Sequence, residues 1–266
     1  MKSYCILLFA AICFISISCK KDAPAITDTK FGCKLIKLAN ETGEYVEFTY
    51  DGDRLSGSST VDKNGKLYDK SILVYDSKGY IQRINFYKDG LTETDPSSYW
   101  DMKVDGQGRI TESKLYSRRN SNSNYELGLY SYNEYNDKGQ ISKMTTDPAY
   151  YRRYVYDTHG NAVKSYDYIS SNKVEYLSYE TVFDTKLNPA NNNPLYQYLL
   201  LFGFFDVYST NNVLEAKYYK YDGGLSLKTT CSYTYNDREY PAEVVRTDSS
   251  NYTISTQKSI YTYSCN

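Results

Sequence analysis

The chain offers little material for catalytic side-chain chemistry. Its single histidine, His159, stands at the third position of a turn that runs from Asp157 to Gly160. No serine or cysteine near His159 forms a nucleophile motif, so Ser-His-Asp and Cys-His catalysis lack their components. The glycines occur singly in turns, unlike those of a phosphate-binding loop. One histidine and no CxxC pair cannot build a zinc site. We therefore expect no metal site, no cofactor and no enzymatic activity.

Paired carboxylates are the catalytic arrangement that the sequence leaves open. A glycosidase-like hydrolase needs two carboxyl groups about 5–10 Å apart, and this distance cannot be read from a sequence. Most acidic residues here, such as Asp51 and Asp76, already stand at turns, where a carboxylate bonds the backbone ahead of it. A hydrolase therefore remains an alternative to a non-enzymatic protein.

The composition indicates a thin β-sheet wall. The 266 residues include 31 basic and 32 acidic side chains, which leaves a net charge of -1. This balance provides no electrostatic footprint for nucleic acid. Tyrosine accounts for 33 residues, and the mean hydropathy is -0.63. Because tyrosine combines an apolar ring with a polar hydroxyl, it suits a surface that is half buried and half wet.

The first nineteen residues have the layout of a bacterial export signal. Lys2 precedes an apolar run from Cys5 to Ile17, and small residues lead to Cys19, the order of n-region, h-region and cleavage site. The end of the segment, ISISC, resembles a bacterial lipobox, in which the cysteine is acylated. We predict a lipoprotein signal peptide over 1–18, a lipid anchor on Cys19 and a lipidated tether over 19–30. Plain secretion, with Cys19 as an ordinary thiol, is the alternative.

The residues directly after Cys19 bear on the cellular location. KKD follows at once and resembles the charged surface-export signals of Bacteroidetes lipoproteins. We therefore expect an outer-membrane lipoprotein that contacts the membrane through Cys19. We place it at the cell surface in preference to the periplasmic face.

Three cysteines remain in the mature chain, an odd number for an oxidising compartment. Cys33 begins the first strand-like segment, and Cys265 ends the last one. If these strands are neighbours, a Cys33–Cys265 disulfide closes almost the whole chain, and this pairing is our preference. Pairing of either one with Cys231, or three unpaired thiols, are the alternatives.

A recurrent unit organises the mature chain. It reads aromatic-x-aromatic-Asp-x-x-Gly-x-aliphatic, as in VYDSKGYI. Aromatic residues two apart share one face of a strand. An aspartate can accept hydrogen bonds from the backbone of a turn, and the glycine takes the left-handed conformation that lets the strand return. Each unit thus predicts a β-hairpin, and the expected turn anchors are Asp51, Asp76, Asp105, Asn136, Asp157, Asp184, Asp222 and Asn236.

Chained hairpins make an antiparallel meander, here of about sixteen strands. Open sheets rarely exceed about ten strands without curling, and closure removes the exposed edges. We therefore predict an all-β fold, a large meander rolled into a wide barrel or shell that forms a single domain over 31–266. A barrel of that size has an interior wider than its side chains fill.

The order of motifs along the mature chain resembles two known groups of proteins. The hairpin units resemble YD repeats of the Rhs and teneurin type, which roll into β-shells. The lipobox, CKLIKL, VFDTKLNP and YNDREYPAEV before the terminal YTYSC together resemble an uncharacterised family of Bacteroidetes lipoproteins with a porin-like fold. The resemblance implies a β-barrel and brings no known activity.

Three segments depart from the repeat. PLYQYLLLFGFFDVYSTNN is the most apolar part of the mature chain, and we predict a short helix over 194–202 and a strand over 204–208. We expect it to be a plug inside or across the barrel, with contact to a partner or lipid as the alternative. The polar segment 117–126 predicts a solvated hairpin loop. Trp100 is expected in the core or rim, with sugar stacking as the alternative.

Three functions remain compatible with the sequence. Our preference is a non-enzymatic binding module for a glycan or peptide, because tyrosine-rich surfaces give a large contact area at a low entropic cost. A structural or assembly scaffold of the cell envelope is the second, and the hydrolase is the third. A barrel embedded in the outer membrane is disfavoured, because Lys, Asp and Asn interrupt the alternation that lipid-facing strands need.

Overall fold

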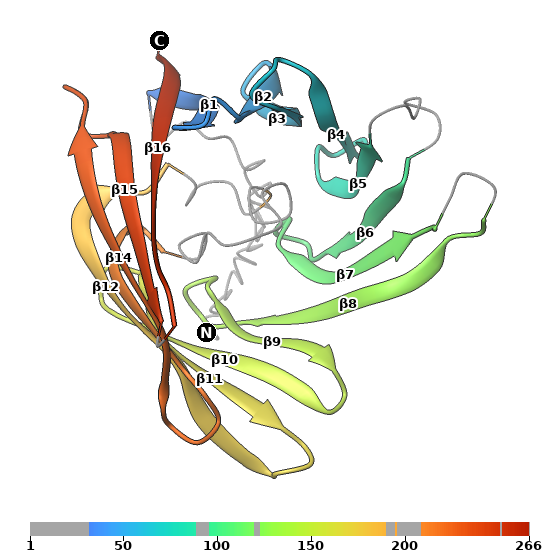
Figure 1. Cartoon of the computed structure of the whole chain (residues 1–266). Coiled ribbons are helices and arrows are strands. Elements are labelled where there is room, and N and C mark those ends of the chain that lie inside the picture. The colour runs from blue at the N-terminus through green and yellow to red at the C-terminus, as the bar shows by residue number, and fades with distance from the viewer. Residues whose placement is uncertain are drawn as a thin grey trace, which may run out of the picture.

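A computed structural model describes residues 32–88, 96–119, 123–189, 195, 209–250 and 252–265 of the chain. These residues form sixteen β-strands in a single sheet (Figure 1). Each strand pairs antiparallel with the next, and the last pairs back onto the first, so the sheet is a closed barrel. The prediction of an all-β meander that closes on itself is confirmed. The segments 1–18 and 19–30 lie outside the described residues.

Turns of two to five residues join most successive strands, and longer connections precede Ser98, Glu126 and Asn211. Their bounds are β1 Cys33–Asn40, β2 Tyr45–Asp51, β3 Arg54–Val61, β4 Leu67–Tyr75, β5 Ile81–Lys88, β6 Ser98–Val104, β7 Ile110–Ser117, β8 Glu126–Tyr135, β9 Ile141–Asp147, β10 Tyr150–Tyr156, β11 Ala162–Ile169, β12 Val174–Leu187, β13 Asn211–Tyr219, β14 Leu225–Tyr235, β15 Pro241–Ser250 and β16 Ile254–Cys265.

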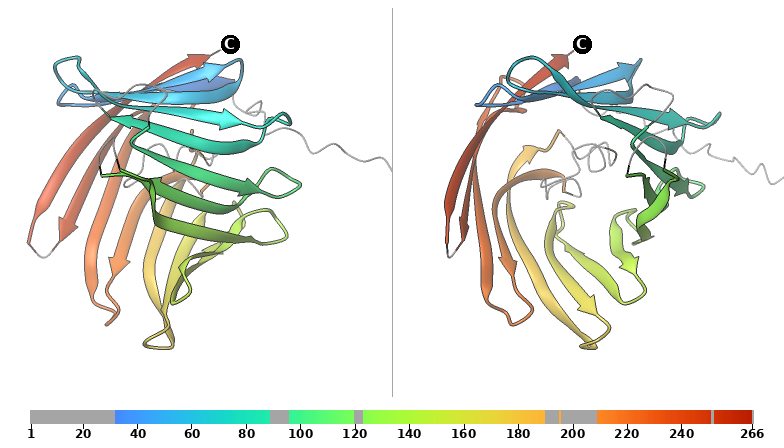
Figure 2. Two further views of the ribbon diagram at one scale, coloured as in Figure 1. Left: turned by 90° about the vertical axis from the view of Figure 1, so that its right-hand side faces the viewer. Right: turned by 45° about the vertical axis from the view of Figure 1, so that its right-hand side comes forward.

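The barrel has two ends that differ in sequence. Because the strand number is even, β1 begins and β16 ends at one end, which we call the near end. The turns that follow β2, β4, β6, β8, β10, β12 and β14 lie there, and the turns that follow the odd-numbered strands lie at the other end, the far end (Figure 2). The turns anchored at Asp76, Asp105, Asn136, Asp157 and Asn236 are therefore all at the near end.

Alternation along each strand separates an inward face from an outward face. On β4, Ser71 and Leu73 are buried while Tyr68 and Val74 are exposed, as a period of two requires. Side chains crowd together on the concave side of a curved sheet, so the buried face is the inner one. The main core cluster lies on this inward face of β1 to β7, and it comprises Leu35, Leu38, Phe48, Leu55, Leu73, Ile81, Ile84, Trp100, Met102, Ile110 and Leu195.

Leu195 is informative because it belongs to the connection between β12 and β13, yet it is buried in this core cluster of β1 to β7. The other residues of the helix expected over 194–202, and the strand expected over 204–208, lie outside the described residues. Trp100 is buried in the same cluster, in agreement with the expected core packing. Of the loop expected over 117–126, Ser117 ends β7 and Glu126 begins β8, and residues 120–122 lie outside the described residues.

The predicted turn chemistry holds at five of the eight anchors. At Asp76, one carboxylate oxygen accepts hydrogen bonds from the backbone N–H groups of Lys78 and Tyr80, each at 2.8 Å. Gly79 adopts a φ of 83°, which glycine tolerates at little cost. The same pair of bonds, to the second and fourth residues after the anchor, recurs at Asp105, Asn136, Asp157 and Asn236.

Three of the expected anchors are corrected by the structure. Asp51 ends β2 at a two-residue turn over Gly52 and Asp53. It therefore does not begin a five-residue turn of the kind that Asp76 begins. Asp222 accepts a hydrogen bond from the backbone N–H of Gly224 at 2.8 Å, as expected of a turn residue. It lies inside a turn that begins at Lys220, where Gly223 has the positive φ, and so it is not the first residue of that turn. Asp184 lies within β12 and not at a turn.

Two turns of the same chemistry escaped the sequence pattern. Asn40 and Asp62 each accept backbone hydrogen bonds from the second and fourth residues that follow them. Both turns lie at the far end, and Ala39 or Val61 stands where the pattern requires an aromatic residue. The aromatic residue is therefore not a requirement of the turn itself.

The tyrosine before the anchor links successive near-end hairpins. Tyr75 donates a hydrogen bond from its hydroxyl to the carbonyl oxygen of Leu55 at 2.5 Å, and burial raises its pKa to about 12. Tyr135 bonds the carbonyl of Ile110, and Tyr156 bonds that of Ile141. Each acceptor is the first or second residue of the strand that follows the preceding near-end turn. The Tyr-Asp pair thus makes one turn and ties it to its neighbour.

Gly57 provides a stability test of the closely packed strands. A Cβ at this position of β3 would overlap the backbone carbonyl oxygen of Ser71 on β4. We expect Gly57→Ala to lower the free energy of unfolding by about 1–3 kcal/mol, as overpacking does. Gly128→Ala on β8 is the matched control, since its nearest neighbouring atom would lie at 3.8 Å. Urea titrations in which both variants match the unchanged chain would contradict this packing.

Candidate functional site

The cysteines that close the chain meet at the near end. Cys33 and Cys265 are register partners on β1 and β16, with Cα atoms 4.0 Å apart, and they form a disulfide across 232 residues. Cys231 lies on β14, outside this disulfide. The predicted lipidation site, Cys19, is not among the described residues.

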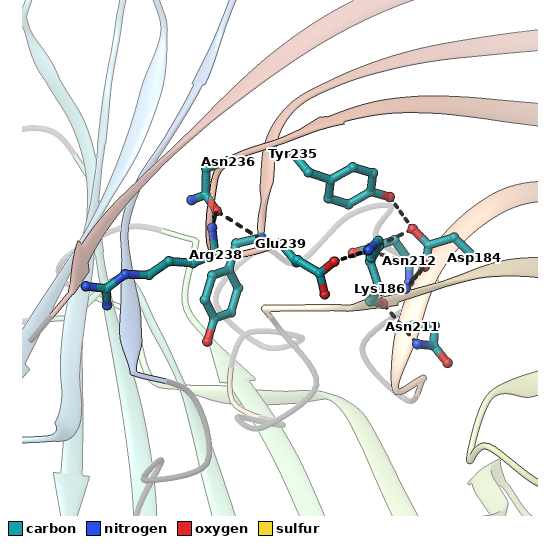
Figure 3. Close-up of polar contacts among 9 residues, drawn as sticks. Asp184, Lys186, Asn211, Asn212, Tyr235, Asn236, Arg238 and Glu239 are labelled. Carbon is teal, nitrogen blue, oxygen red and sulfur yellow. Dashed lines mark hydrogen bonds and ion pairs between the residues drawn. The ribbon is translucent and has the colours of Figure 1, made fainter.

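Asp184 is the centre of a partly buried polar cluster at the near end, which we call the clasp (Figure 3). Its carboxylate accepts hydrogen bonds from the backbone N–H groups of Lys186 and Asn212 at 2.9 and 3.0 Å. The side-chain amide of Asn212 and the hydroxyl of Tyr235 donate to the same carboxylate. Burial, and then the hydrogen bond to Asp184, raise the pKa of Tyr235. Tyr235 therefore stays a donor, and the carboxylate is fully occupied.

The clasp joins the two ends of the connection between β12 and β13. The N–H of Asn188 donates to the carbonyl of Thr210 at 2.9 Å. Asn161, from the turn between β10 and β11, exchanges two hydrogen bonds with Asn211, at 2.9 and 3.0 Å. These contacts fix where the connection leaves and rejoins the wall. The clasp is thus a positioning device for the chain that carries Leu195.

Glu239 breaks a local rule in the same region. It adopts a φ of 64°, at the turn position where Asp76, Asp105 and Asn136 turns use glycine. Its carboxylate pairs with Lys186. A side chain in this conformation is strained, and its ion pair with the clasp gives a physical reason for a non-glycine residue here.

A second polar group lies on the inward face of β10 to β12. Arg152 donates from Nε and Nη2 to the two carboxylate oxygens of Asp167, at 2.6 and 2.8 Å. Nη2 also donates to the hydroxyl of Tyr150 at 3.2 Å. Tyr176 is the register partner of Asp167 on β12. The Asp167 side chain is only 7% exposed, whereas that of Arg152 is 31% exposed, so this bidentate ion pair is reached by solvent from the arginine side.

The surroundings fix the protonation states of this group. Burial lowers the pKa of Arg152, but the hydrogen bonds and charge of Asp167 outweigh it, and the pKa is raised. Burial raises the pKa of Tyr150, and it also raises that of Tyr176. The tyrosines therefore keep their hydroxyl protons and offer a donor and an acceptor each.

The inward polar face continues onto β13 to β15. The Arg152 guanidinium lies 5.9 Å from the ring of Tyr179, whose centroid is 6.1 Å from that of Tyr218. Further along, Asp248 accepts hydrogen bonds from Thr229 at 2.5 Å and from Arg246 at 3.0 Å. We call this set the inward row, and it comprises Tyr150, Arg152, Asp167, Tyr176, Tyr179, Tyr218, Thr229, Arg246 and Asp248.

Sequence reasoning did not single out the inward row. Arg152 and Asp167 are fifteen residues apart, and only the register of β10 with β11 brings them together. The neighbouring Arg153 has the opposite orientation and pairs with Glu175 at 2.8 Å. The available signal was that adjacent residues of one strand face opposite sides, so one arginine of YRRYVYD had to point inward.

The outward face is polar and charged. Cross-strand ion pairs recur around the wall, as between Lys143 and Glu134, or Lys164 and Glu180, at 2.9 and 2.8 Å. Tyr151 and Tyr168 stack with centroids 4.7 Å apart, and the Lys143 ammonium lies over Tyr151. Oppositely charged pairs directly across strands stabilise a sheet that is in contact with water.

The residues with catalytic potential are not assembled for catalysis in the described part of the chain. His159 is exposed at its turn, 3.9 Å from the Asp157 carboxylate. The inward carboxylates Asp167 and Asp248 are each ion-paired with an arginine. No group of three potential metal ligands occurs among the described residues. None of the helices described is long and apolar enough to cross a membrane.

No protein-family model matches the chain, and no curated protein matches it. Among solved structures, a porin-like protein from Bacteroides uniformis ATCC 8492 is 13% identical over 89% of this chain and 97% of that chain, with a TM-score of 0.48. One from Bacteroides vulgatus ATCC 8482 is 13% identical over 87% and 99%, with a TM-score of 0.41. A TcdB2-TccC3-Cdc42 structure is 13% identical over 84% of this chain and 14% of that chain, with a TM-score of 0.35.

These likenesses are weak in sequence and in superposition, and they concern shape alone. Structural neighbours of this chain are thus porin-like proteins from Bacteroides. The lipoprotein and YD-repeat parts of the expected resemblance stay predictions. What the protein does has to be inferred from its own side chains.

Proposed function

We propose that the protein is an envelope lipoprotein, anchored in the outer membrane through Cys19 and displayed at the cell surface, that binds a glycan or peptide without catalysing a reaction. The observation that carries the proposal is the inward row. It places tyrosine rings beside hydrogen-bonding groups whose positions are fixed by ion pairs, the Arg152–Asp167 pair being bidentate. Rings of this kind provide contact area, and fixed polar groups provide orientation.

The charge balance of the inward row favours a glycan over a peptide. Arg152 and Arg246 are each paired with a carboxylate, so the row presents hydroxyl groups and dipoles with little net charge. A neutral ligand rich in hydroxyl groups matches such a surface, because it replaces water without leaving a charge unpaired. A neutral oligosaccharide is therefore the first ligand class to test.

The test uses a glycan array, followed by calorimetric titration with the glycans that bind. We expect Arg152→Ala to weaken binding at least tenfold, because it removes the guanidinium and frees the Asp167 carboxylate. Arg153→Ala is the matched control, since Arg153 is the next residue, is ion-paired with Glu175 and faces outward. A peptide library screened in parallel decides between the two ligand classes. Binding that both variants retain equally would overturn the assignment to the inward row.

The anchor has a separate test. We expect Cys19→Ala to move the protein from the membrane fraction to the soluble fraction, because acyl chains contribute roughly 0.8 kcal/mol per buried CH₂. Fractionation of cells followed by immunoblotting measures the change. Unchanged fractionation would contradict lipidation at this cysteine and would leave the ligand assignment untouched.

A further inference from the structure

Several far-end hairpins carry exposed apolar side chains, and the three most exposed of these among the described residues, Tyr221, Tyr252 and Ile254, lie along one arc of this end. The arc spans the three neighbouring hairpins that join β11 to β12, β13 to β14 and β15 to β16. Tyr221, Tyr252 and Ile254 are 73%, 92% and 77% exposed, and Val174 and Leu225 are also exposed. We call these five residues the apolar arc. The near-end turns, by contrast, present mainly Asp, Asn, Lys and Gly.

Each member of the arc stands at or next to a turn. Val174, Leu225 and Ile254 are the first residues of β12, β14 and β16, and Tyr221 and Tyr252 lie in the turns themselves. Their side chains therefore project from the end of the barrel. Lys173 and Lys220 stand beside Val174 and Tyr221 at the same tips, so the arc combines tyrosine, branched aliphatic residues and lysine.

We infer that the apolar arc docks on the surface of a lipid bilayer. Tyrosine prefers the headgroup region, aliphatic residues prefer the acyl boundary, and lysine reaches the phosphates. Neighbouring hairpins are about 10 Å apart, at about 4.8 Å per strand, so the arc is a row of separate apolar tips. A fluid bilayer accepts separate tips, whereas a protein partner requires a continuous and complementary patch.

The length of chain before β1 permits this orientation. The chain from Cys19 to Cys33 reaches about 45 Å when extended, at about 3.3 Å per residue. A strand of eight residues, such as β1 or β11, is about 26 Å long. A tether that leaves the near end can therefore return along the wall and let the far end contact the membrane that holds the acyl chains. The arc covers one side of this end, so docking tilts the barrel.

The experiment uses the chain from residue 19 onward with Cys19→Ala, which isolates the arc from any acyl anchor and from any glycan ligand. Co-sedimentation with vesicles of phosphatidylethanolamine and phosphatidylglycerol at a ratio of about 3:1 gives the partition coefficient. We expect binding, and we expect Val174→Asp to weaken it at least tenfold. Val182→Asp is the matched control, because Val182 lies on the same strand, is 56% exposed against 60% for Val174, and stands away from the arc.

The outcomes separate the bilayer from other occupants. Vesicle binding that is lost with Val174→Asp and with Tyr252→Ser, and kept with Val182→Asp, supports the inference. No vesicle binding by the unchanged arc overturns it, and so does binding that the arc variants retain. Concentration-dependent self-association that the arc variants abolish, without vesicle binding, would also overturn it and assign the arc to a second copy of the chain. Circular dichroism of every variant establishes that the barrel is intact.

Discussion

Removal of the Cys33–Cys265 disulfide is expected to lower the free energy of unfolding by about 5 kcal/mol. The bond joins residues separated by 232 positions. In the chain-entropy description, a crosslink stabilises a protein by restricting its unfolded chain, and the effect grows with the logarithm of the loop length. The double variant Cys33→Ser/Cys265→Ser removes the disulfide and leaves the other register partners of β1 and β16, which close the sheet, unchanged. Urea unfolding measures the loss.

Cys231→Ser is the control for this prediction, since Cys231 is outside the disulfide. We expect its effect to stay below about 1 kcal/mol, as for a small change at a partly exposed residue. Chemical reduction of the unchanged chain should reproduce the loss seen in the double variant. Equal stability of the double variant and the unchanged chain would show that the disulfide adds no stability beyond that of the β1–β16 strand pairing.

The second large effect is expected at the inward ion pair. Asp167→Ala should lower the free energy of unfolding by about 3 kcal/mol, because it leaves the Arg152 guanidinium inside the barrel without its carboxylate. This value is at the lower end for broken buried pairs, since the Arg152 side chain is still 31% exposed. Thermal and urea unfolding both report the change.

Glu175→Ala is the matched control, because Glu175 pairs in the same way with the outward-facing Arg153. An ion pair in contact with water contributes about 0–1 kcal/mol, so we expect a small effect. Replacing both members of the inward pair, with Arg152→Met and Asp167→Leu, should recover much of the loss, because no buried charge remains. A double variant as unstable as Asp167→Ala would contradict this explanation.

Local chemistry made the hairpins predictable from the sequence. The turns at Asp76 and at the four equivalent anchors were predicted correctly, because every hydrogen bond of such a turn joins residues within five positions of each other. The errors occurred where one part of the pattern was missing. Asp184 has the preceding aromatic residue, but TKLNP follows it without a glycine three positions later. The chain continues along β12, and the carboxylate is used by the clasp instead. Asn236 also lacks this glycine and still forms the turn, because Glu239 adopts the positive φ there.

The sequence predicted which strand face the tyrosines of the repeat occupy, but it did not predict what their hydroxyl groups bind. Their spacing indicated a shared face, whereas the structure shows that a hydroxyl such as that of Tyr156 bonds the backbone of the previous hairpin. The inward row was out of reach for the same reason. Arg152 and Asp167 meet through strand register, and register depends on the whole sheet rather than on either segment.

The seam between β1 and β16 has a consequence for how the chain matures. Fifteen of the sixteen strand pairings join consecutive segments, so they can form one after another before the last segment is available, and local pairings form fast. The final pairing must wait for the last segment to arrive. Until then the sheet has two unpaired edge strands, and unpaired edge strands can form hydrogen bonds with other chains. A polypeptide truncated before Ile254 would therefore form an open sheet with unpaired edges. We expect such a truncated chain to aggregate rather than to form a smaller folded barrel.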